Sequence, residues 1–195
     1  MAVRGRILTH YAMIDDDDKI PFWRALVDRV HRAHPKECKF IMQLSHSGRQ
    51  QDQGGVENRY KKALSSTNQK DYFHGILCQA MTPLQIYEVV QQFGRAARRA
   101  KQAGVDGVEL HGANGYLITQ FLSSGINDRT DGYGGSLANR YRFLREIIHS
   151  IRDHVGDRYH LQLKISAEDY NNALYPWPGR DRVIEYVRNK YGAEN

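Results

Sequence analysis

Three polar side chains stand close together in the segment HGANGY, residues 111–116. His111 and Asn114 can each donate a hydrogen bond, and two donors aimed at one carbonyl oxygen would polarise it. Tyr116 follows two residues later, where its hydroxyl could deliver a proton as a general acid. These residue types fit a reaction in which a carbonyl compound is polarised and a neighbouring atom is protonated.

Two more polar side chains, Gln43 and Lys164, stand near the ends of other strand-like segments. Gln43 opens the segment QLSHSGR, which also contains Ser45, His46 and Arg49. The Gln43 amide offers both a donor and an acceptor, and Lys164 offers a positive charge. This pair suits a planar, amide-rich ring that becomes anionic when it is reduced.

Each of these side chains also has a structural interpretation. A single His or Asn in a polar loop is more often a turn former, and Tyr116 could anchor the loop by packing. Lys164 could be a solvated lysine at a sheet edge. Taken singly, the structural interpretation is favoured for each residue. Taken together at the ends of successive strands, the functional interpretation is favoured.

Strand-like and helix-like segments alternate along the chain. Strands are expected over residues 5–13, 39–45, 105–110 and 159–166. One helix is expected to begin at Pro21 and to end at HPKE, and a short final helix over residues 180–191. Thr82, Pro83 and Gln85 form a helix-start signature, and Gly104 ends that helix. Ser136 is expected to cap another helix that ends at Gly156, whereas residues 48–81 show no clear period.

The alternation predicts an α/β fold with parallel strands and right-handed helical crossovers. Two architectures fit it, an open doubly wound sheet and a (β/α)8 barrel. In the segment YHLQLKIS, residues 159–166, apolar and polar side chains alternate, whereas a central strand of an open sheet is usually apolar on both faces. No GxGxxG follows the first expected strand. Both observations favour the barrel, in which sites lie at the C-terminal ends of the strands.

Composition excludes several classes of protein. The chain has 195 residues, of which 41% are hydrophobic, so that a buried core is expected and wholesale disorder is not. No apolar run reaches the roughly 18 residues of a membrane helix, and the first residues lack the apolar segment of a signal peptide. Cys38 and Cys78 form no CxxC motif, which disfavours a disulfide framework and a metal site. We therefore expect a cytoplasmic protein without membrane contacts.

The formal net charge of +6 raises the alternative of nucleic-acid binding. Basic residues cluster in the segment GRAARRAKQAG, residues 94–104. Its alanines are expected to form the buried stripe of a helix whose charges face solvent. No aromatic side chains interleave with the charges to stack on bases. We therefore expect no nucleic-acid partner.

The sequence resembles the old yellow enzyme family of FMN-dependent NADH:flavin oxidoreductases. The resemblance rests on FIMQLSHSGRQ, on the long segment AGVDGVELHGANGYLITQFLSSGINDRTDGYGGSLANRYRFLREII and on LQLKISAEDY. With the helices between them, these segments cover most of residues 5–175. The resemblance implies a (β/α)8 barrel that binds FMN at its C-terminal mouth. It also implies NAD(P)H as reductant and an activated alkene, such as an enone, as substrate.

The resemblance also assigns roles to the residues singled out above. His111 and Asn114 match the pair that holds the substrate carbonyl, and Tyr116 matches the tyrosine that protonates the α-carbon. Gln43 matches the glutamine that binds the pyrimidine edge of the flavin. Lys164 stands where many members carry Arg; either cation can stabilise an anionic reduced flavin, but Lys lacks the planar fork.

The chain is shorter than the roughly 250 residues of a typical barrel. We expect one incomplete domain over residues 1–195, holding strands two to five of the family barrel, with a divergent tail over about 176–195. Such a piece would lack the loops that hold the FMN phosphate, and it would bind FMN weakly or not at all. It would expose two sheet edges, through which copies could self-associate. The alternative to an enzyme is therefore a non-catalytic barrel fragment.

Overall fold

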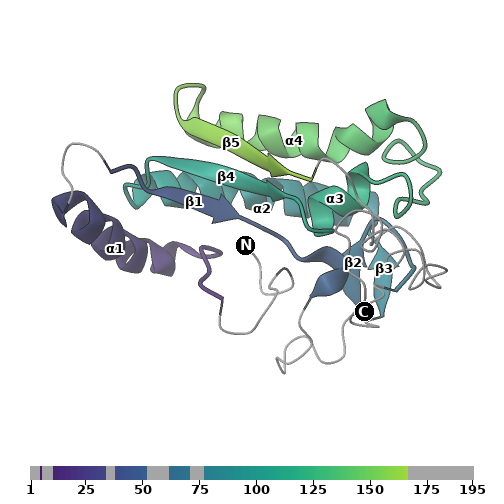
Figure 1. Cartoon of the computed structure of the whole chain (residues 1–195), viewed down its shortest axis with the longest axis horizontal. Helices are drawn as coiled ribbons and strands as arrows, with labels where there is room; N and C mark the ends of the chain where they lie inside the picture. Colours follow the sequence, from purple (N-terminus) through teal and green to yellow (C-terminus); the bar gives the residue numbers. More distant parts are fainter. Residues whose placement is uncertain (1–4, 6–10, 34–37, 52–61, 71–76, 167–195) are drawn as a thin grey trace, which may run out of the picture.

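The main sheet consists of three parallel strands in the order β1-β4-β5 (Figure 1). The computed structural model describes residues 5, 11–33, 38–51, 62–70 and 77–166. Within them the strands are β1 (Ile41–Leu44), β4 (Gly107–Gly112) and β5 (His160–Ile165). The register places Gln43 beside Glu109, and Glu109 beside Gln162. Two residues further along, His111 lies beside Lys164. The expected parallel arrangement is confirmed for these strands.

Two long helices connect the strands, and their starts follow the sequence signals. Helix α2 (Pro83–Gln102) begins with a complete capping box: the Gln85 amide N–H donates to Thr82 Oγ1, and the Thr82 amide N–H donates to Gln85 Oε1. Helix α4 (Leu137–Val155) is capped by Ser136, whose hydroxyl accepts from the Asn139 amide. Gly156 ends α4 with a φ of +78°, a conformation that glycine adopts without strain. Both helices are confirmed.

The sheet has one apolar face and one polar face. Met42 and Leu44 of β1 and Val108 and Leu110 of β4 are buried in one cluster with residues of α2 and α4. Figure 1 shows both helices along the same side of the sheet. The opposite face carries Gln43, Glu109, Gln162 and Lys164. A doubly wound sheet would bury both faces under helices, so cover on one face fits a barrel wall instead.

Helix α1 (Ile20–Ala33) follows a short 3-10 helix, η2 (Asp17–Lys19). Its C-terminal end is tied to the start of β4 by Asp106. The Asp106 carboxylate contacts His31 Nε2 at 2.7 Å and accepts from the Phe40 amide at 2.8 Å and from Lys39 Nζ at 3.1 Å.

The basic segment of α2 has the arrangement expected from the sequence. Its alanines are buried, and its residues Arg98 and Arg99 form ion pairs with Asp17 of η2.

Several elements were not expected from the sequence. The stretch without a clear period contains the 3-10 helix η3 (Gly48–Gln50) and a second sheet of two parallel strands, β2 (Ala63–Ser65) and β3 (Cys78–Ala80). Strands of three residues are too short to show a period. Helix α3 (Leu117–Leu122) directly follows the segment HGANGY, where no helix was expected. The expected strand over residues 5–13, the tail and the final helix lie wholly or largely outside the described residues.

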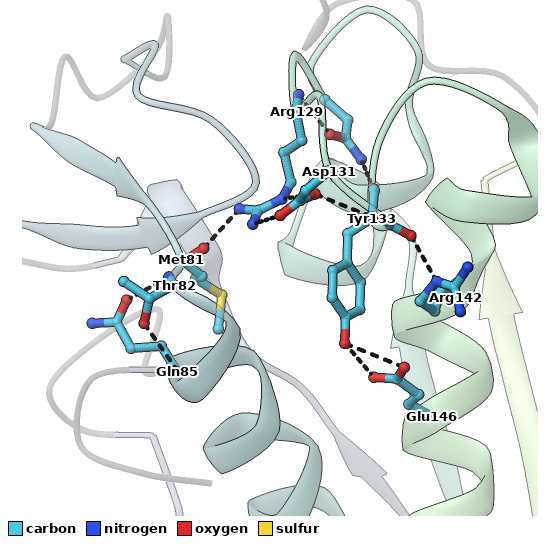
Figure 2. Close-up of polar contacts among 10 residues, drawn as sticks. Met81, Thr82, Gln85, Arg129, Asp131, Tyr133, Arg142 and Glu146 are labelled. Carbon is cyan, nitrogen blue, oxygen red and sulfur yellow. Dashed lines mark hydrogen bonds and ion pairs between the residues drawn. The ribbon is translucent and has the colours of Figure 1, made fainter.

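The loop between α3 and α4 is held by a network of polar contacts (Figure 2). Arg129, whose side chain is 8% exposed, donates from Nη1 to the Met81 carbonyl at 2.7 Å and from Nε to Asp131 Oδ1 at 2.9 Å. The Tyr133 hydroxyl donates to Glu146 of α4 at 2.9 Å, and Arg142 Nε donates to the Gly132 carbonyl at 2.6 Å. The loop is therefore bound both to the start of α2 and to α4.

Within the described residues, no helix combines the length and the apolar character that a membrane crossing requires.

Candidate active site

A tight turn places Asn114 and Tyr116 at the C-terminal end of β4. Asn114 and Gly115 have φ angles of +59° and +73°, and the Tyr116 amide donates to the Ala113 carbonyl at 3.3 Å. Positive φ at both central residues defines a type I′ turn, for which Asn-Gly is the preferred dipeptide. The backbone N–H of Asn114 donates to Oγ of Ser166, which follows β5, at 3.1 Å. The turn is therefore fixed against the neighbouring strand.

His111 is a buried imidazole whose proton position can be inferred. It is 6% exposed, and its Nδ1 accepts a hydrogen bond from the Ala113 amide at 3.3 Å. Burial and then the charge of Lys164 hold the pKa of His111 below its ordinary value. The ring is therefore neutral at neutral pH and, with Nδ1 accepting, carries its proton on Nε2. His111 can act as a hydrogen-bond donor through Nε2.

Tyr116 lies directly beside His111 and keeps its proton. The two rings meet edge to face, with centroids 4.9 Å apart. Burial, with a smaller contribution from Tyr11, raises the pKa of Tyr116 above its ordinary value. The protonated phenol is the form that a general acid requires.

The polar face of the sheet carries an amide–carboxylate row made of Gln43, Glu109 and Gln162, one residue from each strand. Gln43 Nε2 donates to Glu109 Oε1 at 2.6 Å, and Gln162 Nε2 donates to Glu109 Oε2. Hydrogen bonds from Gln43 and then Gln162 lower the pKa of Glu109, with further help from the charge of Lys164. Glu109 is therefore ionised. Its signal in the sequence was a charged residue between Val108 and Leu110 of an expected strand, which places it on the face opposite to those two apolar side chains.

Lys164 is exposed on the same face as this row, beside His111. Its charge lowers the pKa of both His111 and Glu109. The structure therefore brings Gln43, His111 and Lys164 onto one face, with Asn114 and Tyr116 in the turn that follows β4.

Other polar residues of the segment QLSHSGR are buried, among them Ser45, His46 and Arg49. His46 accepts from the Gly48 amide through Nδ1, and Arg49 Nη1 donates to the carbonyls of Gln69 and Lys70. His46 and Arg49 therefore hold the loop that follows β1.

Sequence reasoning also missed Gln120, a fully buried amide in α3. Its Nε2 donates to the carbonyls of Gly115 at 2.7 Å and Ser47 at 3.2 Å. Its Oε1 accepts from Ser65 Oγ at 3.0 Å and from the Arg49 amide at 3.1 Å. One side chain thus joins the turn after β4 to the loop after β1. It stands in the largely apolar segment LITQFL, and nothing local marks it as a polar anchor.

The described residues contain no group of three or more His, Cys, Asp or Glu side chains arranged to hold a metal ion. The arrangement on the polar face offers hydrogen-bond donors to a carbonyl oxygen from His111 and Asn114, a protonated phenol from Tyr116, and amides with one cation from Gln43 and Lys164.

Comparisons with known proteins identify the family of this chain. A sequence profile of the NADH:flavin oxidoreductase / NADH oxidase family matches residues 1–174. An NADPH dehydrogenase from Halalkalibacterium halodurans is 42% identical over 167 residues, which are 86% of this chain and 46% of that protein. An NADH oxidase from Thermoanaerobacter brockii is 40% identical over 155 residues, 80% of this chain and 23% of that protein.

Among solved structures, an Old Yellow Enzyme from a Pichia species matches with a TM-score of 0.77 and 28% identity, over 98% of this chain and 53% of that one. The chain thus spans about half the length, or less, of these three relatives. The expected fold class is confirmed: the described residues form part of a (β/α)8 barrel. With the profile match over most of its length, the chain belongs to the NADH:flavin oxidoreductase / NADH oxidase family.

Proposed function

We propose that this chain carries the active-site wall of an FMN-dependent oxidoreductase that reduces activated alkenes, such as enones, with NAD(P)H as reductant. Bound FMN supplies the hydride chemistry, with the hydride taken from NAD(P)H and directed to the β-carbon of the alkene. The family supports FMN and NAD(P)H, and the relatives named above include an NADPH dehydrogenase and an NADH oxidase.

The polar face fits a flavin ring. The amide of Gln43 is exposed on that face and can offer both an acceptor and a donor to the pyrimidine edge of the ring. Lys164 provides a positive charge on the same face, where negative charge on the ring would be stabilised. Gln43 and Lys164 are therefore the residues that would hold the ring.

His111 and Asn114 are assigned to the substrate carbonyl. His111 Nε2–H and the Asn114 side-chain amide would donate to the carbonyl oxygen, drawing electron density away from the conjugated alkene. Tyr116, next to His111, would deliver its proton to the α-carbon. The observation that carries the proposal is the hydrogen bond from the Ala113 amide to His111 Nδ1, because it leaves Nε2 as the donor.

The test uses the full chain with excess FMN under anaerobic conditions. Fluorescence quenching reports FMN binding, and addition of NADH or NADPH and then 2-cyclohexenone reports the two half-reactions. Excess FMN is used because this chain is expected to bind it weakly. We expect slow alkene reduction that falls by about 10²–10⁴-fold in Tyr116→Phe. It should be kept in Tyr141→Phe, a control at a tyrosine of α4 that is 41% exposed. FMN binding without any turnover of the enone would contradict the proposed reaction. Absence of FMN binding would favour the non-catalytic alternative.

A further inference from the structure

We infer that Glu109 is a positioning residue that fixes the orientation of the Gln43 amide, so that Gln43 turns its carbonyl oxygen toward an N–H of the flavin ring. This inference rests on the proposed function, since it concerns how the same face holds FMN.

The first step is the geometry of the amide–carboxylate row. Glu109 lies on the central strand, with Gln43 and Gln162 as its register partners on the two sides. Gln43 Nε2 lies 2.6 Å from Glu109 Oε1, and Gln162 Nε2 donates to Glu109 Oε2. Each carboxylate oxygen therefore has its own amide donor, and the two glutamines are held in the same orientation relative to Glu109.

The second step is the chemistry of the partners. The two ends of a glutamine amide are nearly alike in shape, and only the hydrogen bonds decide which end points where. An ionised carboxylate only accepts hydrogen bonds, so Gln43 must direct its NH2 group to Glu109. The flipped amide would bring its carbonyl oxygen against a negative oxygen. The remaining acceptor, Gln43 Oε1, is then available to a donor such as the imide N–H of the flavin.

The third step is that the carboxylate stays charged. The two glutamine donors and the positive charge of Lys164 hold the pKa of Glu109 below its ordinary value. A glutamine at position 109 would keep the shape but could donate as well as accept. The Gln43 amide would then be able to take either orientation.

A first experiment needs no flavin. In the 15N-labelled full chain, the side-chain NH2 signals of Gln43 are assigned by their loss in Gln43→Ala. We expect these signals to shift as the pH is lowered and Glu109 takes up a proton. The shift should vanish in Glu109→Gln and persist in Gln162→Ala, which keeps the Glu109–Gln43 bond. If the chemical shifts of the Gln43 NH2 signals change neither with pH nor in Glu109→Gln, the inference is overturned.

A second experiment measures binding of FMN and of N3-methyl-FMN, which lacks the imide N–H. Glu109→Gln should weaken FMN binding about 3–10-fold, the range expected for one misdirected hydrogen bond, and should leave N3-methyl-FMN unchanged. Gln43→Ala should cause a similar loss, and the double variant should lose no more than Gln43→Ala alone, because Glu109 acts through Gln43. Fully additive losses, or equal losses for both ligands, would contradict the inference. A wild-type chain that takes up no FMN would contradict the proposed function instead, and the amide signals would then decide the orientation.

Discussion

The ring of Tyr116 meets the ring of His111 at an interplanar angle of 88°, with centroids 4.9 Å apart. Burial disfavours the charged form of both side chains, so their pKa values shift in opposite directions. The pKa of His111 is lowered and that of Tyr116 is raised. Both groups are therefore neutral at neutral pH, and both can donate a hydrogen bond. A pair of neutral donors is suited to a carbonyl substrate that must be polarised and then protonated.

The first prediction concerns the proton donor in the assembled flavoprotein. Tyr116→Phe should slow alkene reduction by about 10²–10⁴-fold, the usual range for a lost general acid. Reduction of the flavin by NAD(P)H should change far less, because that half-reaction delivers no proton to an alkene carbon. Stopped-flow absorbance separates the two half-reactions, and equal slowing of both would exclude the role assigned to Tyr116.

The second prediction concerns the charge beside His111. The pKa of His111 is below the ordinary value of 6.5, so the unfolded chain takes up this proton at a higher pH than the folded chain. The free energy of unfolding should therefore fall as the pH drops below about 6.5 and level off below the folded-state pKa. Lys164→Met should raise the His111 pKa and weaken this dependence, whereas Lys19→Met, at a distant ion pair, should not. An NMR titration of the imidazole measures the shift directly; an unchanged His111 pKa in Lys164→Met would refute the prediction.

The sequence predicted helices α2 and α4 because their signals are local: the capping box at Thr82 specifies the start of α2 within a few residues. The Asn-Gly dipeptide at residues 114–115 is an equally local signal, but the turn that it forms was not predicted. The alternation around Gln162 was likewise visible: Gln162 and Lys164 lie on the polar face, and Leu161 packs against the core on the other.

The missed features depend on distant partners. β2 and β3 are only three residues long, which is too short to show an alternation of apolar and polar residues. They pair with each other rather than with the main sheet. Gln120 lies in a largely apolar helix, and its role depends on Ser47 and Ser65, which are far away in sequence. A buried amide of this kind is recognisable only once its partners are in place.

The third prediction concerns the loop network in Figure 2 at alkaline pH. Burial, followed by the hydrogen bond to Glu146, raises the pKa of Tyr133 from 10.0 to about 12. The neutral phenol is thus favoured by the folded state. Its contribution to stability should be present below about pH 10 and be lost as the pH rises towards 12.

Chemical denaturation across this pH range, compared between the wild type and Tyr133→Phe, tests the prediction. The difference in unfolding free energy should shrink as the pH rises. Tyr87→Phe, at a side chain that is 61% exposed, serves as the control and should follow the wild type. A constant difference in unfolding free energy between the wild type and Tyr133→Phe from pH 9 to about 12 would mean that ionisation of Tyr133 does not affect stability.

The fourth prediction concerns the contact between α2 and α4. A Cβ added at Gly94 would lie 2.4 Å from Ser150 Oγ and 2.8 Å from the Ser150 carbonyl oxygen, and a backbone atom cannot turn aside. Gly94→Ala should therefore destabilise the fold by about 1–3 kcal/mol, which exceeds the gain in helix propensity. At Gly132 the nearest atom would be Arg142 Nε at 3.7 Å, so Gly132→Ala should stay within about 0.5 kcal/mol of the wild type. Urea unfolding compares the two, and equal stabilities would show that the helices can separate without cost.

The last prediction concerns Gln120, which joins the turn after β4 to the loop after β1. Gln120→Leu keeps the size of the side chain but removes partners from the carbonyls of Gly115 and Ser47 and from Ser65 Oγ and the Arg49 amide. Each buried group left without a partner costs about 1–3 kcal/mol, so the free energy of unfolding should fall by more than about 2 kcal/mol.

The effect of Gln120→Leu should also reach the site, because the Gly115 carbonyl belongs to the turn between Asn114 and Tyr116. NOE contacts between the rings of Tyr116 and His111 should weaken in Gln120→Leu. They should persist in Gln102→Leu, an exposed glutamine at the end of α2. Loss of stability with unchanged ring contacts would show that Gln120 supports the fold without positioning the turn.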